Sequence, residues 1–210
     1  MSRILITSGP TRQYLDPVRY LTNASSGRMG KALAESALAA GHEVVIVSGP
    51  VEVQYPAGAE VIPVISTEEM LAACSEAFPN CDGMIGVAAP CDYRPRRVHE
   101  QKLSKTGDPL VLHLIETPDV VATLGSRKRA DQWVVGFALE TEDQRFRAIV
   151  KLEKKSCDLI VLNGPDAMNA NENEVEVIDA QGQVVGELRG AKSEVASGIM
   201  QIISERLIHG

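Results

Sequence analysis

The 210-residue sequence is poor in aromatic side chains and lacks the cysteine spacings that indicate a metal site or a redox motif. Aromatic residues make up only 4 % of the chain, so its core must be built from aliphatic side chains. The four cysteines show neither a CxxC pair nor the spacing of metal ligands. We therefore expect Cys74, Cys81, Cys91 and Cys157 to be reduced, mostly buried thiols, as is usual in cytoplasmic proteins.

Long apolar runs and an excess of positive charge are also missing. No run approaches the roughly 20 apolar residues that cross a bilayer, and the N-terminus begins with a strand-like run instead of a signal peptide. The net charge of −7 disfavours a general nucleic-acid surface, because that binding depends on neutralising phosphates. These absences predict a cytoplasmic protein that binds neither membranes nor nucleic acid.

Short apolar runs alternate with helical patterns along most of the chain. Several runs are continuous, which is typical of strands covered on both faces. Strands are predicted at 3–8, 43–48, 60–65, 83–89, 110–115, 133–139 and 158–163. Helices are predicted at 27–40, 67–78, 118–130, 142–156 and 191–208, and a hairpin at 173–190. The pattern indicates a single α/β domain over 1–210, with a Rossmann-like, doubly wound, mostly parallel sheet, helices on both faces and a C-terminal β-hairpin.

In such a sheet, ligands bind beyond the carboxyl ends of the strands. Ser25, Ser26 and Gly27 open the helix at 27–40, where free N–H groups and the helix dipole attract anions. A simple serine cap is the alternative role. Asn23 is required by neither role, and it offers a donor and an acceptor to a substrate. Gly30 is expected to let this helix pack close to the sheet.

Further candidates follow later strands. Asp92 is placed to reach a ribose hydroxyl or a metal ion, with an Asx turn as the alternative. Cys91 has no evident histidine partner, which favours an inert thiol over a nucleophile. Lys102 lies in a long polar loop at 90–108, and Lys151 and Lys155 share a helix face. These lysines suggest a polyphosphate ligand, with solvated surface lysines as the alternative.

A nicotinamide-dependent oxidoreductase is disfavoured. Residues 9–25 separate the first strand from its helix, where a dinucleotide fingerprint would place GxGxxG directly. The strand at 43–48 is not followed by an acidic residue for a ribose, and no tyrosine has a lysine four residues later.

Several long motifs occur in one order along nearly the whole chain. They are "GPTRQYLDPVRYLTNASSGRMG" (9–30), "AAPCDYRP" (88–95), "KLSK" (102–105), "GFALET" (136–141) and "KKSCDLIVLN" (154–163). Together they resemble the phosphopantothenoylcysteine synthetase, or phosphopantothenate–cysteine ligase, family of coenzyme A biosynthesis. The first motif is far more specific than a lone glycine pattern.

The resemblance implies a reaction in two steps. A nucleoside triphosphate activates the carboxylate of 4′-phosphopantothenate, which releases pyrophosphate and leaves an acyl-nucleotidylate. The amine of L-cysteine then attacks to form 4′-phosphopantothenoyl-L-cysteine. Bacterial members use CTP, and the motifs look bacterial, so we expect CTP and an acyl-CMP, with ATP as the alternative. Mg²⁺ is expected and a flavin is not.

The resemblance also assigns roles to residues. Asn23 holds the acyl intermediate for the second step, and Lys102 neutralises charge in the first. Ser25, Ser26 and Gly27 cradle phosphate, and Asp92 is a candidate metal ligand. The remaining implied nucleotide contacts are Asp92, Val121, Ala122, Thr123, Leu124, Phe137, Lys151 and Lys155, and the implied substrate contacts are Ala88 and Ala89.

Two departures from the family pattern bear on these expectations. Ser104 replaces the middle lysine of the family's basic loop, so that position is dispensable or the nucleotide binds more weakly. Many bacterial members carry a flavin-dependent decarboxylase domain, which these residues do not include. We therefore expect a monofunctional ligase or one half of a bifunctional protein, with a separate phosphopantothenoylcysteine decarboxylase as a candidate partner.

The resemblance further implies a homodimer with the 173–190 hairpin at or near its interface. The alternative function is a noncatalytic regulatory subunit of the same fold that binds a nucleotide or phosphopantothenate. The presence of Asn23, Asp92 and Lys102 argues against this alternative.

Overall fold

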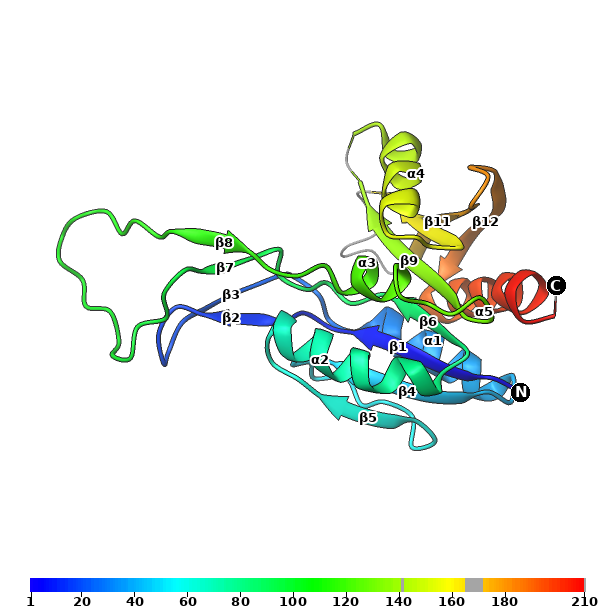
Figure 1. Ribbon diagram of the computed structural model, residues 1–210, viewed down its shortest axis with the longest axis horizontal. Coiled ribbons are helices and arrows are strands. Elements are labelled where there is room, and N and C mark those ends of the chain that lie inside the picture. Colours follow the sequence, from blue (N-terminus) through cyan, green and yellow to red (C-terminus); the bar gives the residue numbers. More distant parts are fainter. Residues whose placement is uncertain (141, 165–171, 210) are drawn as a thin grey trace.

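The computed structural model describes residues 1–140, 142–164 and 172–209, and a central sheet organises them (Figure 1). Its strand order is β12-β11-β10-β9-β6-β1-β4-β5. The parallel strands are β1 (Arg3–Ser8), β4 (Glu43–Ser48), β5 (Glu60–Pro63), β6 (Gly83–Gly86), β9 (Trp133–Leu139) and β10 (Leu159–Asn163). Numbered along the chain, these six strands have the 3-2-1-4-5-6 order of the Rossmann fold, which confirms the predicted fold class.

The C-terminal part adds two strands to this parallel sheet. Strands β11 (Glu172–Asp179) and β12 (Val184–Ala191) pair with each other in antiparallel fashion, and β11 also pairs antiparallel with β10. The predicted hairpin is thus confirmed, and it extends the sheet at one edge.

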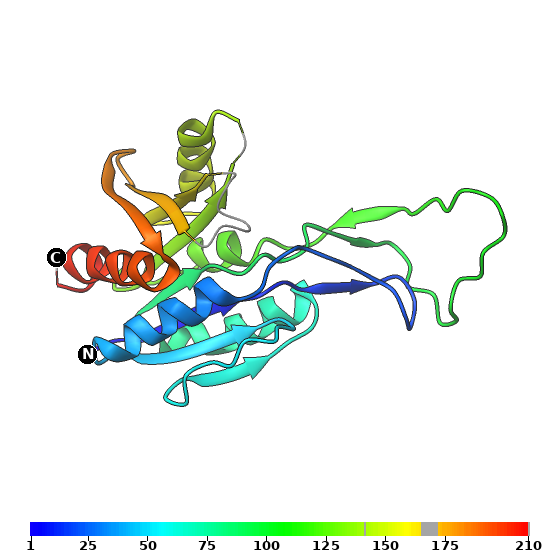
Figure 2. The same ribbon diagram turned by 180° about the vertical axis from the view of Figure 1, so that it is seen from behind.

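Helices cover both faces of the sheet (Figures 1 and 2). One layer holds α1 (Arg28–Ala39) and α5 (Lys192–Ile203), which continues into a π-helical turn at Ser204–Ile208. The other holds α2 (Thr67–Ala77), the short 3₁₀ turn at Phe78–Asn80, α3 (Val120–Gly125) and α4 (Gln144–Lys154). No helix among the described residues is both long enough and apolar enough to cross a membrane.

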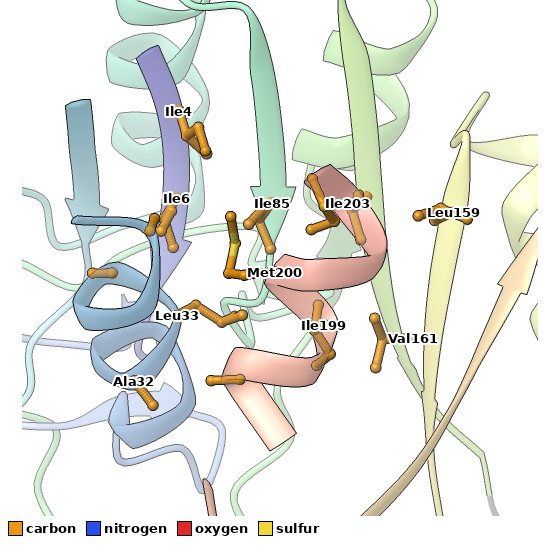
Figure 3. Packing of buried hydrophobic residues seen from close by; sticks show 14 of the residues in the cluster. Ile4, Ile6, Ala32, Leu33, Ile85, Leu159, Val161, Ile199, Met200 and Ile203 are labelled. Atoms are coloured by element: carbon orange, nitrogen blue, oxygen red, sulfur yellow. The ribbon is translucent and has the colours of Figure 1, made fainter. Parts of the chain in front are cut away.

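Aliphatic side chains fill the space between these layers, as the low aromatic content requires. Figure 3 shows Leu33 of α1 and Ile199 and Met200 of α5 packed over Ile6 and Ile85 of the sheet. Alternate strand residues point to opposite faces, so the neighbours of Ile6 on β1 pack into the second layer. Both faces of the central strands are therefore buried, which explains their continuous apolar runs.

Two strand ribbons leave the sheet together and form an arm (Figures 1 and 2). One ribbon is β2 (Arg12–Tyr14) with β3 (Tyr20–Thr22), and the other is β7 (Tyr93–Pro95) with β8 (Leu114–Glu116). The ribbons follow the carboxyl ends of β1 and β6, and the N–H of His99 donates to the carbonyl of Leu15 at 2.9 Å. The arm points away from the end of the molecule that holds both termini.

The arm accounts for the main errors of the sequence prediction. The run at 110–115 is not a strand of the central sheet, because its only ordered strand begins at Leu114 and pairs with β7. Val111 is 74 % exposed, since none of the described helices covers the arm. Strand β7 lies inside the predicted loop at 90–108, and the helix predicted at 118–130 ends at Gly125. Strands β2 and β3 were not predicted.

Two glycines allow close packing where the chain leaves β1. A Cβ on Gly30 would overlap Ser8 Oγ, which confirms that this glycine lets α1 approach the sheet. A Cβ on Gly49, directly after β4, would overlap the carbonyl oxygen of Pro10. A backbone carbonyl cannot swing aside as a flexible side chain can.

Gly49→Ala is therefore expected to lower the free energy of unfolding by about 1–3 kcal/mol through overpacking. Chemical denaturation monitored by circular dichroism measures this change. Gly164→Ala is the matched control, because no heavy atom of the described residues lies within 4 Å of the added Cβ and φ is outside the left-handed region. Equal stabilities for the two variants would contradict the close approach at Gly49.

Candidate active site

A cleft of about 500 Å³ lies beyond the carboxyl ends of β1 and β6. The strand order reverses between these two strands, which is where ligands bind in open α/β sheets. The cleft brings together most of the residues singled out from the sequence. These are Asn23, Ser25, Ser26, Gly27, Ala88, Ala89, Asp92, Phe137 and Lys151.

The start of α1 forms one wall of the cleft. Its N-cap is Gly27, with φ of 73°, and none of the described side chains caps the helix, so the serine cap that was the alternative role is wrong. A Cβ on Gly27 would lie 2.9 Å from Cγ1 of Val51, so both space and backbone angle favour glycine. The free N–H groups of the first turn and the positive end of the dipole thus remain available to an anion.

Asn23 links the two segments that leave the sheet. Its Nδ2 donates to the carbonyl oxygens of Ala89 at 3.2 Å and Pro90 at 2.8 Å. Its Oδ1 accepts no hydrogen bond from the described residues. The side chain is therefore oriented by the backbone after β6 and still offers an acceptor at the cleft.

A smaller cavity of about 100 Å³ adjoins the cleft and shares Ala88, Asp92 and Phe137 with it. It is also lined by Val121 and Lys155. The rest of the predicted nucleotide segment on α3 lies elsewhere. The Ala122 N–H donates to Asp119, Thr123 Oγ1 donates to the Asp119 carbonyl, and Leu124 is buried in the core.

The two predicted helix lysines already have carboxylate partners. Lys151 Nζ lies 2.5 Å from Oε1 of the buried Glu140, and Lys155 Nζ lies 3.1 Å from Oδ2 of Asp119. Arg28 and Lys192 also line the cleft, although the sequence did not indicate them. Lys192 opens the last helix, far along the chain from the other motifs, so no spacing could connect it with them.

Lys102 does not join the other predicted residues. It lines none of the described cavities, because the loop between β7 and β8 lies at the far end of the arm (Figure 1). The next residue, Leu103, is held on both sides of its backbone. Its N–H donates to Asp16 Oδ2 at 3.1 Å, and its carbonyl accepts from the Arg19 guanidinium at 2.6 Å.

Asp16 is the anchor of this attachment, and its side chain is fully buried. Burial raises the pKa of Asp16, but backbone N–H groups of Val18, Leu103 and Arg19 and the Arg19 guanidinium donate to the carboxylate. These bonds outweigh burial and hold the pKa well below its usual range. Asp16 is therefore ionised throughout the neutral and mildly acidic range.

Cys91 lines the small cavity but is shielded. Its Sγ lies 3.5 Å from the carbonyl oxygens of Thr11 and Leu21, and burial raises the pKa of the thiol. Since the thiolate is the nucleophile, this environment fits the inert interpretation. All four cysteines are free and buried, as predicted.

The strand order and the cleft at its reversal define a Rossmann-like α/β protein with a ligand site at the switch point. A family profile described as "DNA/pantothenate metabolism flavoprotein C-terminal domain" matches residues 1–207, and the chain belongs to this family. The resemblance to phosphopantothenoylcysteine synthetases found from the motifs is thereby confirmed.

Similar proteins agree with this family. The coenzyme A biosynthesis bifunctional protein CoaBC of Vibrio cholerae is 40 % identical over 98 % of this chain and 53 % of its own length. That of Bacillus subtilis is 43 % identical over 80 % of this chain and 41 % of its own length. The crystal structure of the C-terminal domain of CoaBC matches with a TM-score of 0.85 and 39 % identity, over 99 % of this chain and 96 % of that one. The chain spans about half the length of the curated relatives it matches.

Asp16→Ala is expected to release the segment around Lys102, because Leu103 loses its anchor. Hydrogen exchange read by mass spectrometry should show faster exchange in peptides that cover residues 99–105. Asp108→Ala, on the same exposed loop, is the control. In the unchanged protein, protection of this segment should stay constant above about pH 4 and weaken as the pH falls below it. The pKa of Asp16 is lower in the folded protein than in the unfolded chain, so its carboxylate stabilises the folded state above the unfolded pKa and loses this effect as it becomes protonated. Equal exchange in Asp16→Ala and the unchanged protein would contradict the anchor.

Proposed function

We propose that this chain joins 4′-phosphopantothenate and L-cysteine into 4′-phosphopantothenoyl-L-cysteine, through an acyl-nucleotidylate and with release of pyrophosphate. One observation carries the proposal. The cleft at the switch point gathers Asn23, the turn at Ser25–Gly27, Asp92 and Phe137, in a chain about 40 % identical to CoaBC proteins. The relatives give no support to a noncatalytic regulatory subunit.

The first step must bring a carboxylate to the α-phosphate of a nucleoside triphosphate, and two anions repel each other. The uncapped start of α1 supports this step, because its N–H groups would stabilise phosphate oxygens without rearrangement. We propose CTP as the nucleotide, which makes the intermediate an acyl-CMP, and ATP is the alternative.

Mg²⁺ would enter with the nucleotide. Asp92 is the carboxylate among the described residues that line the cleft at the switch point, and it makes no ion pair with another described residue. Mg²⁺ commonly binds one or two carboxylates and otherwise keeps water and phosphate oxygens, so Asp92 fits as its single protein ligand. When bound, the ion would neutralise phosphate charge.

In the second step the amine of cysteine attacks the acyl carbon. The bond between the acyl carbon and the phosphate oxygen of the nucleotide then breaks. The nucleoside monophosphate leaves, and the nitrogen loses a proton to become the amide. Asn23 is suited to hold the acyl group during this exchange. Its amide is already oriented by the carbonyls of Ala89 and Pro90 and leaves Oδ1 available as an acceptor. Positioning of this kind supplies much of the acceleration in such reactions.

Lys102 requires a second protomer in this account. Because it sits on the arm, away from the cleft of its own chain, we propose a homodimer in which each arm serves the cleft of the partner, with the β11–β12 hairpin at or near the interface. Exposed apolar side chains along the arm, including Val98 and Leu110, support a contact surface there. We place the enzyme in the cytoplasm, beside a phosphopantothenoylcysteine decarboxylase that would consume its product.

The ligase reaction can be measured as pyrophosphate release with 4′-phosphopantothenate and Mg²⁺, with CTP and ATP in parallel, with and without cysteine. Release should require phosphopantothenate, and the amide should appear by mass only when cysteine is added. Asn23→Ala should still release pyrophosphate but form little amide, whereas Lys102→Gln should lose the first step. No release with either nucleotide would contradict the proposed function, and wild-type amide formation by Asn23→Ala would contradict the role of Asn23.

The shared site can be tested by combining these two defective variants. If Lys102 acts in the partner's cleft, co-expressed Asn23→Ala and Lys102→Gln chains should form mixed dimers with one intact site. Random pairing then gives about a quarter of the wild-type rate of amide formation. Variants mixed just before the assay, without time to exchange subunits, control for a diffusing intermediate. Activity no greater than the sum of the single variants would show that Lys102 acts within its own chain or through no dimer.

A further inference from the structure

A second cleft of about 670 Å³ adjoins the first along the start of α1. The two clefts share Asn23, Ala24, Ser25 and Ser26, together with the side chains of Arg28 and Lys192. Arg12 and Tyr20 extend the second cleft toward the arm, and Glu52 is the carboxylate among its described lining residues. Arg28 and Lys192 thus stand at the junction of the two clefts, beside Asn23.

Lys192 is fixed at this junction by the C-terminal part of the chain. It is the first residue of α5, and its Nζ donates to Oδ1 of Asn173 on β11 at 2.6 Å. Asn173 is only 3 % exposed, so the acceptor is rigidly placed. An ammonium group has three donors, and this bond uses one of them.

The charge of Lys192 is poorly compensated. Burial lowers the pKa of Lys192, and the nearby positive charge of Arg28 lowers it further. Neither residue makes an ion pair within the part of the chain that the structure describes. The free N–H groups at the start of α1 add further positive potential at the same place.

The lysine on α4 that lines the first cleft and the lysine that lines the adjoining small cavity behave differently. Lys151 and Lys155 are each held by a carboxylate, at 2.5 Å and 3.1 Å. In a chain with a net charge of −7, two adjacent cations without a carboxylate are unfavourable unless an anion joins them. An anion that carries more than one negative charge would satisfy both groups at once.

We propose that Arg28 and Lys192 form a phosphate-binding pair at the junction of the two clefts. The pair takes a phosphate group of a substrate, and only the identity of that substrate rests on the proposed function. The source is the ester phosphate of 4′-phosphopantothenate or the phosphates of the nucleotide. In either case the anion ties α5 to the motif residues at the start of α1.

Calorimetric titration of the full chain with 4′-phosphopantothenate, pantothenate and CTP tests the pair. Arg28→Gln and Lys192→Gln are each expected to weaken one phosphate-bearing ligand about 10-fold to 100-fold, which is the worth of a charge-assisted hydrogen bond. Pantothenate, which lacks the ester phosphate, should bind unchanged. Weaker binding of 4′-phosphopantothenate would identify its ester phosphate as the group that the pair binds. Weaker binding of CTP would identify the phosphates of the nucleotide instead.

Lys31→Gln is the matched control, because Lys31 lies on the same helix as Arg28 and pairs with Glu35 at 3.7 Å outside both clefts. Arg28 is exposed, so its variant is expected to fold even if Lys192→Gln is less stable. Wild-type affinities for both phosphate ligands in the two variants would overturn the pair, and so would a wild-type chain that binds neither ligand.

The titrations separate this inference from the proposed function. If the wild-type chain binds phosphate ligands through Arg28 and Lys192 but releases no pyrophosphate, the phosphate-binding pair is supported and the ligase function is contradicted. If the wild-type chain is active and both variants bind the phosphate ligands with wild-type affinity, the ligase function is supported and the phosphate-binding pair is contradicted.

Discussion

The side-by-side departure of two chain segments from β1 and β6 is the constraint on which the site depends. A backbone bridge joins Pro10 to Ala89, and the Ala89 N–H donates to the carbonyl of Gly9 at 2.9 Å. Asn23 closes the same junction through its bonds to Ala89 and Pro90. Because the strand order reverses here, the helices that follow β1 and β6 lie on opposite faces of the sheet, and the space between the segments becomes the cleft.

The same departure explains why the arm exists. Each segment continues outward as a ribbon before its chain returns to a helix, so the ribbons carry Lys102 away from the cleft and leave apolar residues exposed. The buried Asp16 fixes the backbone beside Lys102 by charge-assisted bonds, which do not need a hydrophobic layer. Lys102 is therefore held away from the cleft of its own chain, and it could act in catalysis if a second protomer brought its own cleft to the arm.

Much of the fold could be predicted from the sequence, because central strands buried on both faces must be continuously apolar. The same rule failed for the run at 110–115, since periodicity cannot distinguish a strand covered by helices from a ribbon that is left exposed. The motifs identified most of the cleft, as Asn23 and Asp92 follow strand ends that meet at one edge. The ion pairs of Lys151 and Lys155 could not be foreseen, because Glu140 and Asp119 reach them only through the tertiary fold. Lys192 is brought to the cleft by the sheet order alone.

The proposed function requires the cleft at the switch point to bind a nucleoside triphosphate beside the start of α1. Hydrogen exchange of the full chain, with and without CTP and Mg²⁺, tests it most directly. Bound nucleotide should slow exchange in peptides that cover residues 25–31 and 86–92, whereas peptides of α2, which lines neither cleft, should exchange at an unchanged rate. Unaltered exchange in both segments at saturating nucleotide, or protection confined to another part of the molecule, would contradict it.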